Sequence, residues 1–246
     1  MSNERVTADV WVFDLDNTLY PRDCDLFAQI DVKMKAFVSD LLGIDPADAY
    51  KVQKQYFREH GSTLRGLMDN HGLAPQEFLD FVHDIDVTPV PPNPALDDVL
   101  HQLEGRKIVF TNGSVAHATN VMTRLGITHH FEGIFDIHAA DYLPKPARSA
   151  YDKFLSDYDV DPTRAVMLED IARNLEPAHA LGMTTVWIDC RAMGRPEHTS
   201  GHDWTELPAH IHHRTEALAP FVAAIGAALA DGAEDDASSA LARGQQ

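Results

Sequence analysis

The stretch VFDLDNTLYP, residues 12–21, ends an apolar segment with two acids separated by a single residue. Asp14 follows the apolar run 10–13, Asp16 comes two positions later, and Thr18 two positions after that. Two carboxylates this close at the end of a buried strand repel each other and lose hydration. The stretch therefore predicts a site at which something offsets the repulsion between Asp14 and Asp16.

Short apolar segments rich in Val, Ile, Phe and Thr recur along the chain and predict strands. Most of them show no apolar–polar alternation, which is typical of strands covered on both faces. Helical patterns over 115–126, 148–160 and 173–182 separate them. Strand–helix alternation of this kind predicts an α/β fold, with a three-layer Rossmann-like parallel sheet and right-handed crossovers. The expected strands are 9–13, 107–111, 133–138, 165–169 and 184–189.

A long segment between the first and second expected strands has no strand pattern. A structureless loop of this length would be unusual in a compact domain, so we expect helices there. They are 24–43, 46–61, 62–72 and 74–85, followed by 87–96, a stiff return linker with four prolines. The sequence thus predicts a discontinuous core, 1–20 and 90–200, with an inserted helical cap domain, 21–89.

The C-terminal part of the chain is less informative. Residues 201–230 read as a helical extension, and 231–246 are polar and expected to be disordered. Five histidines lie within 198–213. We expect them to be exposed to solvent, because a zinc site needs ligands at suitable spacing and a packed context.

Composition excludes several classes of partner. The formal net charge of −18 has no compensating basic run, which argues against nucleic acid and anionic membranes. No apolar run approaches the roughly 20 residues of a membrane span, and the N-terminus lacks a signal-peptide pattern. Cys24 and Cys190 are best read as inert thiols in a reducing cytoplasm. The oligomeric state cannot be predicted.

Polar side chains follow several of the expected strands. In open parallel sheets, ligands bind at the carboxyl ends of the strands, so we expect these side chains to meet at one rim. The candidates are Asp14 and Asp16, Thr111 and Asn112, Lys145 between two prolines, and Glu169 with Asp170.

Acids next to a single lysine favour a hard cation such as Mg²⁺, which takes oxygen ligands. An ionised Asp14 can attack phosphorus and form an aspartyl-phosphate. Asp16 can then protonate the leaving oxygen and activate the attacking water. Lys145, Thr111 and backbone N–H groups can surround the transferring phosphoryl group. The expected ligand is a small phosphorylated metabolite.

These residues resemble the four motifs of the haloacid dehalogenase superfamily, which consists mostly of phosphatases. The first motif is Asp14-x-Asp16, the second is Thr111 in FTNGS, the third is Lys145 in PKP, and the fourth is Glu169–Asp170. Within the superfamily, FDLDNTLYP, FTNGS and EDIARNL are similar to the pyrimidine 5'-nucleotidase group, although Glu169 stands where its members often have aspartate.

The resemblance implies a role for each residue of the site. Asp14 would be the nucleophile, Asp16 the acid/base, and Thr111, Asn112 and Lys145 the phosphate-binding residues. Mg²⁺ would be held by the Asp14 carboxylate, the Asp16 backbone carbonyl and Asp170, with Glu169 binding directly or through water. The implied reaction is hydrolysis of a phosphomonoester, such as a UMP- or CMP-like nucleotide.

Other interpretations of individual residues remain open. Thr18 is expected to hydrogen-bond within the turn after the motif. Asn174 either orients Asp170 or caps a helix, and Arg65 either reaches the substrate or pairs with Glu59 or Asp69. The cap residues Tyr56, Phe57, Leu64 and Leu67 are expected to form mostly cap core.

Other reactions also remain open. A phosphatase of a sugar or cofactor phosphate, or a phosphomutase, would use the same first half-reaction. A 2-haloacid dehalogenase needs the nucleophile but no metal and no acid at position 16, and a non-catalytic interaction protein would need none of these groups.

Overall fold

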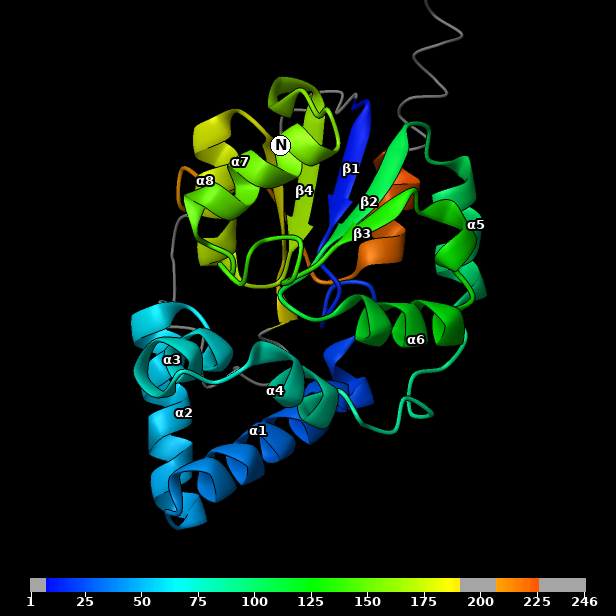
Figure 1. Cartoon of the computed structure of the whole chain (residues 1–246). Coiled ribbons are helices and arrows are strands. Elements are labelled where there is room, and N and C mark those ends of the chain that lie inside the picture. Colours follow the sequence, from blue (N-terminus) through cyan, green and yellow to red (C-terminus); the bar gives the residue numbers. More distant parts are fainter. Residues whose placement is uncertain (1–7, 191–206, 226–246) are drawn as a thin grey trace, which may run out of the picture.

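The core of the molecule is a six-stranded parallel sheet with the order β3-β2-β1-β4-β5-β6. The computed structural model describes residues 8–190 and 207–225 (Figure 1). The strands are β1 (Val10–Phe13), β2 (Arg106–Phe110), β3 (Gly133–Phe135), β4 (Ala165–Glu169), β5 (Thr184–Ile188) and β6 (His213–Thr215).

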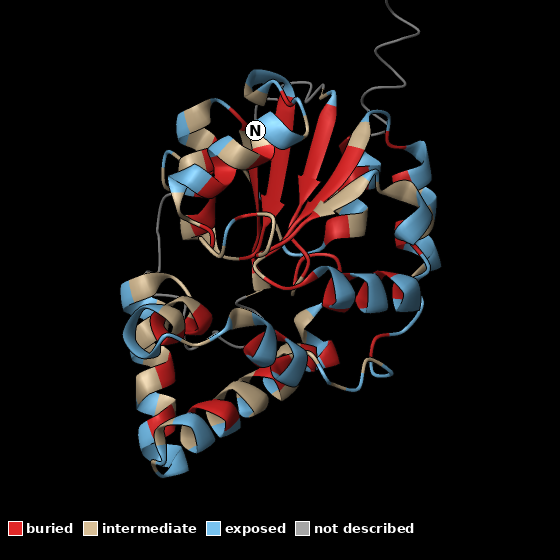
Figure 2. Ribbon diagram, in the orientation of Figure 1, coloured by how far each residue is buried: buried red, intermediate tan, exposed pale blue. Residues whose placement is uncertain are grey.

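Both faces of the sheet are covered by helices, and the central strands β1 and β4 are accordingly buried along their whole length. Trp11 and Phe13 pack on one face, and Val10 and Val12 pack on the other. One face carries α5 (Pro94–Gln102), α6 (Val115–Leu125) and the helical residues 218–225, and the other carries α7 (Arg148–Asp157) and α8 (Leu175–Leu181). Figure 2 shows the buried strands between these exposed helix surfaces. The predicted three-layer α/β fold is confirmed.

Four helices form a separate group beyond the carboxyl ends of the strands (Figure 1). They are α1 (Leu26–Leu42), α2 (Pro46–His60), α3 (Thr63–His71) and α4 (Pro75–Val82). Ile30, Val38, Leu67 and Phe78 belong to their own apolar cluster. Ile137, which follows β3, also belongs to this cluster. The four helices therefore pack mainly on one another and meet the core at the strand ends.

Two elements of the fold differ from the sequence expectations. Helix α5 begins at Pro94, inside the expected linker 87–96, because Asn93 accepts the Leu96 N–H as an N-cap and proline fits the first helical turn. Strand β6 lies within the expected helical extension 201–230 and pairs with β5. Its three residues have little strand character, so pairing with β5 determines their conformation. The tail 231–246 lies outside the described residues.

Several histidines of the C-terminal segment are part of this edge of the sheet, rather than simply solvated. The Thr185 hydroxyl donates to the His210 carbonyl oxygen at 2.7 Å, and the Thr185 N–H donates to Nδ1 of His212 at 3.0 Å. His210 and His213 are half-buried, whereas His212 is exposed. The expectation that these histidines are exposed was therefore wrong for two of the three that the structure describes.

The cysteines and the hydropathy of the helices agree with the sequence expectations. Cys24 and Cys190 are both free, and burial raises the pKa of Cys190 to about 12, which makes an inert thiol. Within the described ranges, every helix is too short or too polar to cross a bilayer.

Candidate active site

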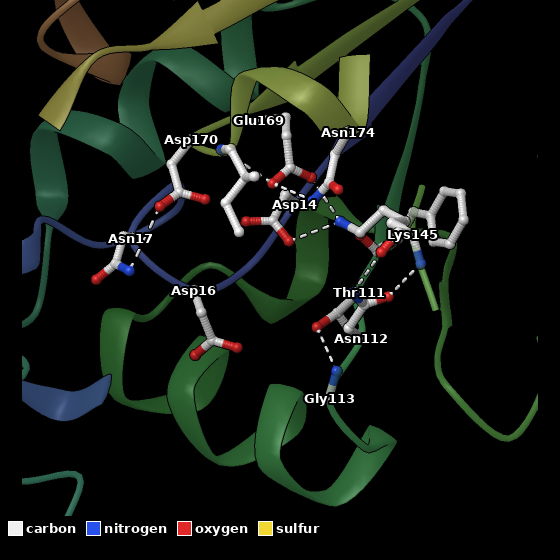
Figure 3. Close-up of polar contacts among 12 residues, drawn as sticks. Asp14, Asp16, Asn17, Thr111, Asn112, Gly113, Lys145, Glu169, Asp170 and Asn174 are labelled. Atoms are coloured by element: carbon white, nitrogen blue, oxygen red, sulfur yellow. Dashed lines mark hydrogen bonds and ion pairs between the residues drawn. The ribbon is translucent and has the colours of Figure 1, made fainter. Parts of the chain in front are cut away.

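The site lies where three adjacent strands end. Asp14 directly follows β1, Thr111 directly follows β2, and Glu169 is the last residue of β4. The Asp14 N–H donates to the Leu168 carbonyl oxygen at 2.9 Å, which continues the β1–β4 ladder and fixes the position of Asp14. Parallel pairing in register therefore brings residues more than 150 positions apart to one rim (Figure 3).

Lys145 is the cation at the centre of the site. Its Nζ donates to Oδ1 of Asp14 at 2.8 Å, to Oε2 of Glu169 at 2.7 Å and to the Phe110 carbonyl oxygen at 2.7 Å (Figure 3). The side chain is 1% exposed, so these three acceptors replace its hydration. Burial opposes the charged form, but Asp14 and Glu169 outweigh it and raise the pKa of Lys145.

Negative charge exceeds positive charge at this point. Asp14, Glu169 and Asp170 each place one carboxylate oxygen within 4.8 Å of the other two, and all three residues are buried. Burial and repulsion from Glu169 raise the pKa of Asp14 to about 7, although Lys145 opposes the shift. The same two causes raise the pKa of Asp170 well above its usual range. One ammonium cannot neutralise three carboxylates, so the donor set fits a hard divalent cation.

The oxygens of the three acids are not equally available. Oε1 of Glu169 accepts from the Ile171 N–H at 3.2 Å and from Nδ2 of Asn174 at 3.1 Å, and its other oxygen accepts from Lys145. Among the described residues, the N–H donor on the Asp170 carboxylate is Nδ2 of Asn17, at a long 3.5 Å. Asp170 thus has free lone pairs for a metal, whereas the two Glu169 oxygens are already bound by protein donors.

Asn174 orients an acid, but a different one from that expected. Its amide holds Glu169 rather than Asp170, and its side chain makes no capping hydrogen bond at the start of α8. Its carbonyl oxygen accepts from the buried Tyr151 hydroxyl. Both alternatives left open by the sequence are therefore replaced by a third.

Asp16 is held at one of its two carboxylate oxygens. Oδ1 accepts from the Tyr20 hydroxyl at 2.6 Å and pairs with Nε2 of His117 at 2.8 Å. Burial would raise the pKa of Asp16, but His117 and Tyr20 outweigh burial and lower it. The other oxygen, Oδ2, accepts from none of the described residues, so it is the one available for proton transfer.

His117 also connects the cap helices to the core. Its ring stacks on that of His83, which follows α4, with 4.6 Å between centroids and 9° between planes. Nδ1 of His83 lies 3.0 Å from the Ser114 hydroxyl oxygen, which also N-caps α6. Burial and His117 lower the pKa of His83 to about 3, so this ring is neutral at ordinary pH.

Sequence reasoning missed Tyr20, His83 and His117. Tyr20 lies four residues after Asp16, and His117 lies 101 residues after it. A single histidine on a helix carries no pattern of its own. The feature that marks His117 is that a polar side chain is buried on α6. Burial is visible only in the structure, so the sequence offered no usable signal.

The phosphate-binding candidates lie on two connected loops. The Thr111 hydroxyl accepts from the Gly113 N–H at 2.9 Å, so its own proton is free for a ligand. Asn112 forms two hydrogen bonds with the backbone of Lys145, from Nδ2 to the carbonyl oxygen at 3.3 Å and from the Lys145 N–H to Oδ1 at 2.8 Å. The Asn112 side chain therefore positions Lys145, and only its backbone N–H remains for phosphate.

Two supporting candidates lie apart from this chemistry. The Thr18 N–H donates to the Leu15 carbonyl oxygen at 3.3 Å, a hydrogen bond within the turn as expected, whereas the buried Thr18 hydroxyl finds no partner among the described residues. Arg65 binds both carboxylate oxygens of Asp69, at 2.8 and 3.0 Å. Arg65 does not line the cavity, so its structural interpretation, with Asp69 rather than Glu59, is the one observed.

A cavity of about 150 Å³ joins the strand ends to the cap helices. Asp14, Asp16 and Lys145 line its core side. Phe57 and Leu64, expected in the cap interior, line its cap side, together with Phe27, Ile30, Met34, Gln53, Phe78, Leu79 and Val82. Leu67 is buried in the cap cluster as expected, and Tyr56 is half-buried beside it.

Three curated proteins are similar to this chain in sequence. Phosphate metabolism protein 8 of Saccharomyces cerevisiae is 24% identical over 192 residues, covering 71% of this chain and 59% of its own. Enolase-phosphatase E1 of Frankia alni is 35% identical over 143 residues, covering 57% and 56%. Fructose-1-phosphate phosphatase YqaB of Escherichia coli is 32% identical over 123 residues, covering 48% and 63%. The chain thus spans under two thirds of the length of these relatives.

Solved structures share the fold at low identity. CbbY from Rhodobacter sphaeroides in complex with xylulose-(1,5)bisphosphate has a TM-score of 0.57 at 17% identity, covering 86% of this chain and 95% of its own. The L-2-haloacid dehalogenase of Xanthobacter autotrophicus has a TM-score of 0.53 at 14% identity, covering 87% and 97%. The family model for haloacid dehalogenase-like hydrolases matches residues 8–182, which include every carboxylate of the site. The chain belongs to the haloacid dehalogenase-like hydrolases.

Proposed function

We propose that this protein is a Mg²⁺-dependent phosphomonoesterase that works through an aspartyl-phosphate on Asp14. The observation that carries the proposal is the buried contact of 2.8 Å between Lys145 and Asp14, with an excess of carboxylates around it and with Asp16 lining the same cavity. A phosphate ester is the substrate class for which this chemistry is suited, because its equatorial oxygens need cations and N–H donors.

Mg²⁺ would be held by the side chains of Asp14 and Asp170 and by the backbone carbonyl of Asp16. Because both Glu169 oxygens are occupied by protein donors, Glu169 would act on the ion through water. When bound, the ion supplies positive charge that keeps Asp14 ionised and offsets the charge of the phosphate.

The protein groups divide the reaction between them. Asp14 attacks phosphorus, so that a new O–P bond forms as the bond to the leaving oxygen breaks. Because the pKa of Asp16 is lowered, Asp16 first takes up a proton from solvent or from the phosphate of the bound ester, and passes it from Oδ2 to the leaving oxygen. It then takes a proton from the water that attacks the aspartyl-phosphate. The second attack breaks the O–P bond to Asp14 and releases phosphate. The Thr111 hydroxyl and the Asn112 N–H hold the equatorial oxygens. Lys145 offsets their charge, while its three N–H groups are engaged by Asp14, Glu169 and the Phe110 carbonyl oxygen.

The proposed substrates are pyrimidine nucleoside monophosphates. Aromatic side chains of the cap, Phe27, Phe57 and Phe78, line the cavity. Nε2 of Gln53 donates to Oδ1 of Asp31 at 2.8 Å, and a carboxylate only accepts, so the Gln53 amide has one possible orientation. Its Oε1 is then buried and has no hydrogen-bond partner in the described part of the chain. A planar ring with an N–H donor, such as uracil or cytosine, suits these walls.

The deciding experiment is phosphate release from a panel of UMP, CMP, sugar phosphates and cofactor phosphates, ranked by kcat/KM. We expect hydrolysis that requires Mg²⁺ and is abolished by Asp14→Asn, which keeps the size of the side chain but removes the nucleophile. Unchanged activity in Asp14→Asn, or after metal removal, would contradict the mechanism. A preference for sugar phosphates would contradict only the nucleotide assignment.

The two other reactions are tested in the same preparation. A 2-haloacid dehalogenase needs no acid at position 16, yet Asp16 is held in place by two donors beside the cavity. Halide release from a 2-chloroacid without Mg²⁺ would favour that reaction. A phosphomutase would instead transfer the phosphoryl group from Asp14 to a second substrate, and isomerised phosphate ester would accumulate in place of inorganic phosphate.

A further inference from the structure

A cluster of two histidines and an aspartate, side chains of types that can ligate a metal, lies on the outer surface of the core. Nε2 of His130 lies 2.7 Å from Oδ1 of Asp97, and Nε2 of the neighbouring His129 lies 3.2 Å from the same oxygen. Asp97 is in the first turn of α5, and both histidines belong to the turn η2 (Thr128–His130) before β3. None of the three lines the active-site cavity.

The two imidazoles converge on one point from consecutive residues. Their ring centroids are 4.0 Å apart, and the ligand atoms of all three residues lie within 4.8 Å of one another. One hydrogen bond to Asp97 would be enough to hold the turn against α5. A second histidine aimed at the same oxygen is not needed for that purpose, and its 64% exposed side chain leaves room for an ion.

The spacing suits a tetrahedral transition metal. Metal–ligand bonds of about 2.0–2.1 Å place neighbouring tetrahedral ligands roughly 3.3 Å apart. The His129–Asp97 distance of 3.2 Å already matches, and the His130–Asp97 distance of 2.7 Å needs only a small opening. Two imidazoles and a carboxylate favour Zn²⁺ over Mg²⁺, which prefers oxygen ligands.

A fourth ligand is within reach on the same helix. His101 lies one turn after Asp97 on α5, and residues four apart share a helix face. Its ring centroid is 6.3 Å from that of His130. A change of side-chain rotamer would bring a third imidazole to the cluster.

We propose that Asp97, His129 and His130, completed by His101 or by water, form a Zn²⁺-class site that is separate from the catalytic centre. Without an ion, α5 and the turn before β3 are linked by the contacts of His129 and His130 with Asp97. A bound ion would replace these contacts with metal–ligand bonds. An ion that binds only the folded state stabilises it, so the site acts on stability rather than on the chemistry at Asp14.

The test is a Zn²⁺ titration of the full chain against a chromophoric chelator, with excess Mg²⁺ present to occupy the acidic site. We expect wild type to bind one more equivalent than His129→Ala or Asp97→Asn. At roughly 100-fold excess over Kd, Zn²⁺ should raise the Tm of wild type by about 5–10 °C more than that of either variant. Co²⁺ should give the visible absorption of a four-coordinate ion in wild type only.

His60→Ala is the matched control, because His60 also pairs with an aspartate, Asp69, at 3.1 Å, but without a second histidine on that oxygen. It should bind as much Zn²⁺ as wild type. His129 is largely exposed, so His129→Ala should fold normally and keep wild-type phosphatase activity. Equal Zn²⁺ stoichiometry and equal Tm shifts in wild type and His129→Ala would overturn the proposal.

Discussion

Nε2 of His117 lies 2.8 Å from Oδ1 of Asp16, across 101 residues of sequence. The contact joins the first turn of α6 to the loop after β1, and the Tyr20 hydroxyl binds the same oxygen. Two donors on Oδ1 leave Oδ2 as the oxygen that can carry a proton. The direction in which Asp16 presents its proton is therefore determined by Tyr20 and His117, two residues to which the resemblance assigned no role.

Removing His117 tests this arrangement. His117→Ala should lower kcat about 10-fold with little change in KM, because the acid loses its orientation whereas phosphate binding is untouched. His117→Gln retains an N–H donor near Oδ1 and should recover part of the rate. Steady-state kinetics on the best substrate of the panel measure both, and a change confined to KM would contradict a positioning role.

Lys145→Met should destabilise the protein by about 3–5 kcal/mol, because the buried carboxylates of Asp14 and Glu169 lose their cation. Urea unfolding with and without Mg²⁺ measures the effect. We expect Mg²⁺ to recover more stability in the variant than it adds to wild type, since the variant holds more uncompensated charge. Lys51→Met, at an exposed pair with Asp48, is the matched control and should leave the stability nearly unchanged, because solvent screens an exposed pair.

The buried, neutral His83 predicts a dependence of stability on pH. Its pKa is about 3 in the folded protein and 6.5 ordinarily, so below pH 6.5 the unfolded chain takes up a proton that the folded protein does not. Stability should therefore fall as pH drops from 6.5 towards 3, by up to about 1.4 kcal/mol per pH unit from this group. His83→Phe keeps a ring against His117 but cannot titrate. Its stability should fall less steeply than that of wild type between pH 6 and 4, and parallel curves would contradict the assignment.

Arg65→Ala should leave catalysis within about twofold of wild type, because Arg65 is fully engaged with Asp69 outside the cavity. Asp69→Asn removes the other charge of the same ion pair, and it should also keep catalysis within about twofold of wild type. If Arg65→Ala raised KM strongly while Asp69→Asn did not, Arg65 would have to contact the substrate after all.

Gln53→Leu should reduce selectivity for pyrimidine nucleotides without abolishing activity. The variant removes the unpartnered Oε1, so kcat/KM for UMP should fall about 10-fold, while that for p-nitrophenyl phosphate, which has no N–H donor, should stay the same. Equal effects on both substrates would indicate a general disturbance of the cap. N3-methyl-UMP, which lacks the ring N–H, should be a poor substrate of wild type and an equally poor one of the variant.

Much of the fold could be predicted because burial on both faces leaves a plain mark in the sequence. Apolar segments such as 165–169 coincide with strands, and the polar residues that end them meet at one rim because parallel pairing aligns the carboxyl ends. β6 could not be predicted in this way, because pairing with β5, rather than local propensity, makes His213–Thr215 a strand.

Some residues of the candidate site could be predicted from the sequence, and others depend on tertiary packing. Asp14, Lys145 and Glu169 are recognisable from their position after strands and between prolines. The partner that Asn174 holds, the hydrogen bonds of Asn112 and the role of His117 depend on side-chain directions between distant segments. Those directions are a property of tertiary packing, and a single sequence carries no separate signal for them.

The ring stack between His83 and His117 has a consequence for motion. His83 follows the last cap helix and His117 belongs to the core, so the cap cannot swing away without separating the two rings and breaking the contact between His83 and Ser114. The same separation removes the ring that covers His117, the residue that holds Asp16. The position of the cap and the orientation of the Asp16 carboxyl are thus energetically coupled. Because such coupling is reciprocal, a ligand that fixes Asp16 also stabilises the cap in this position.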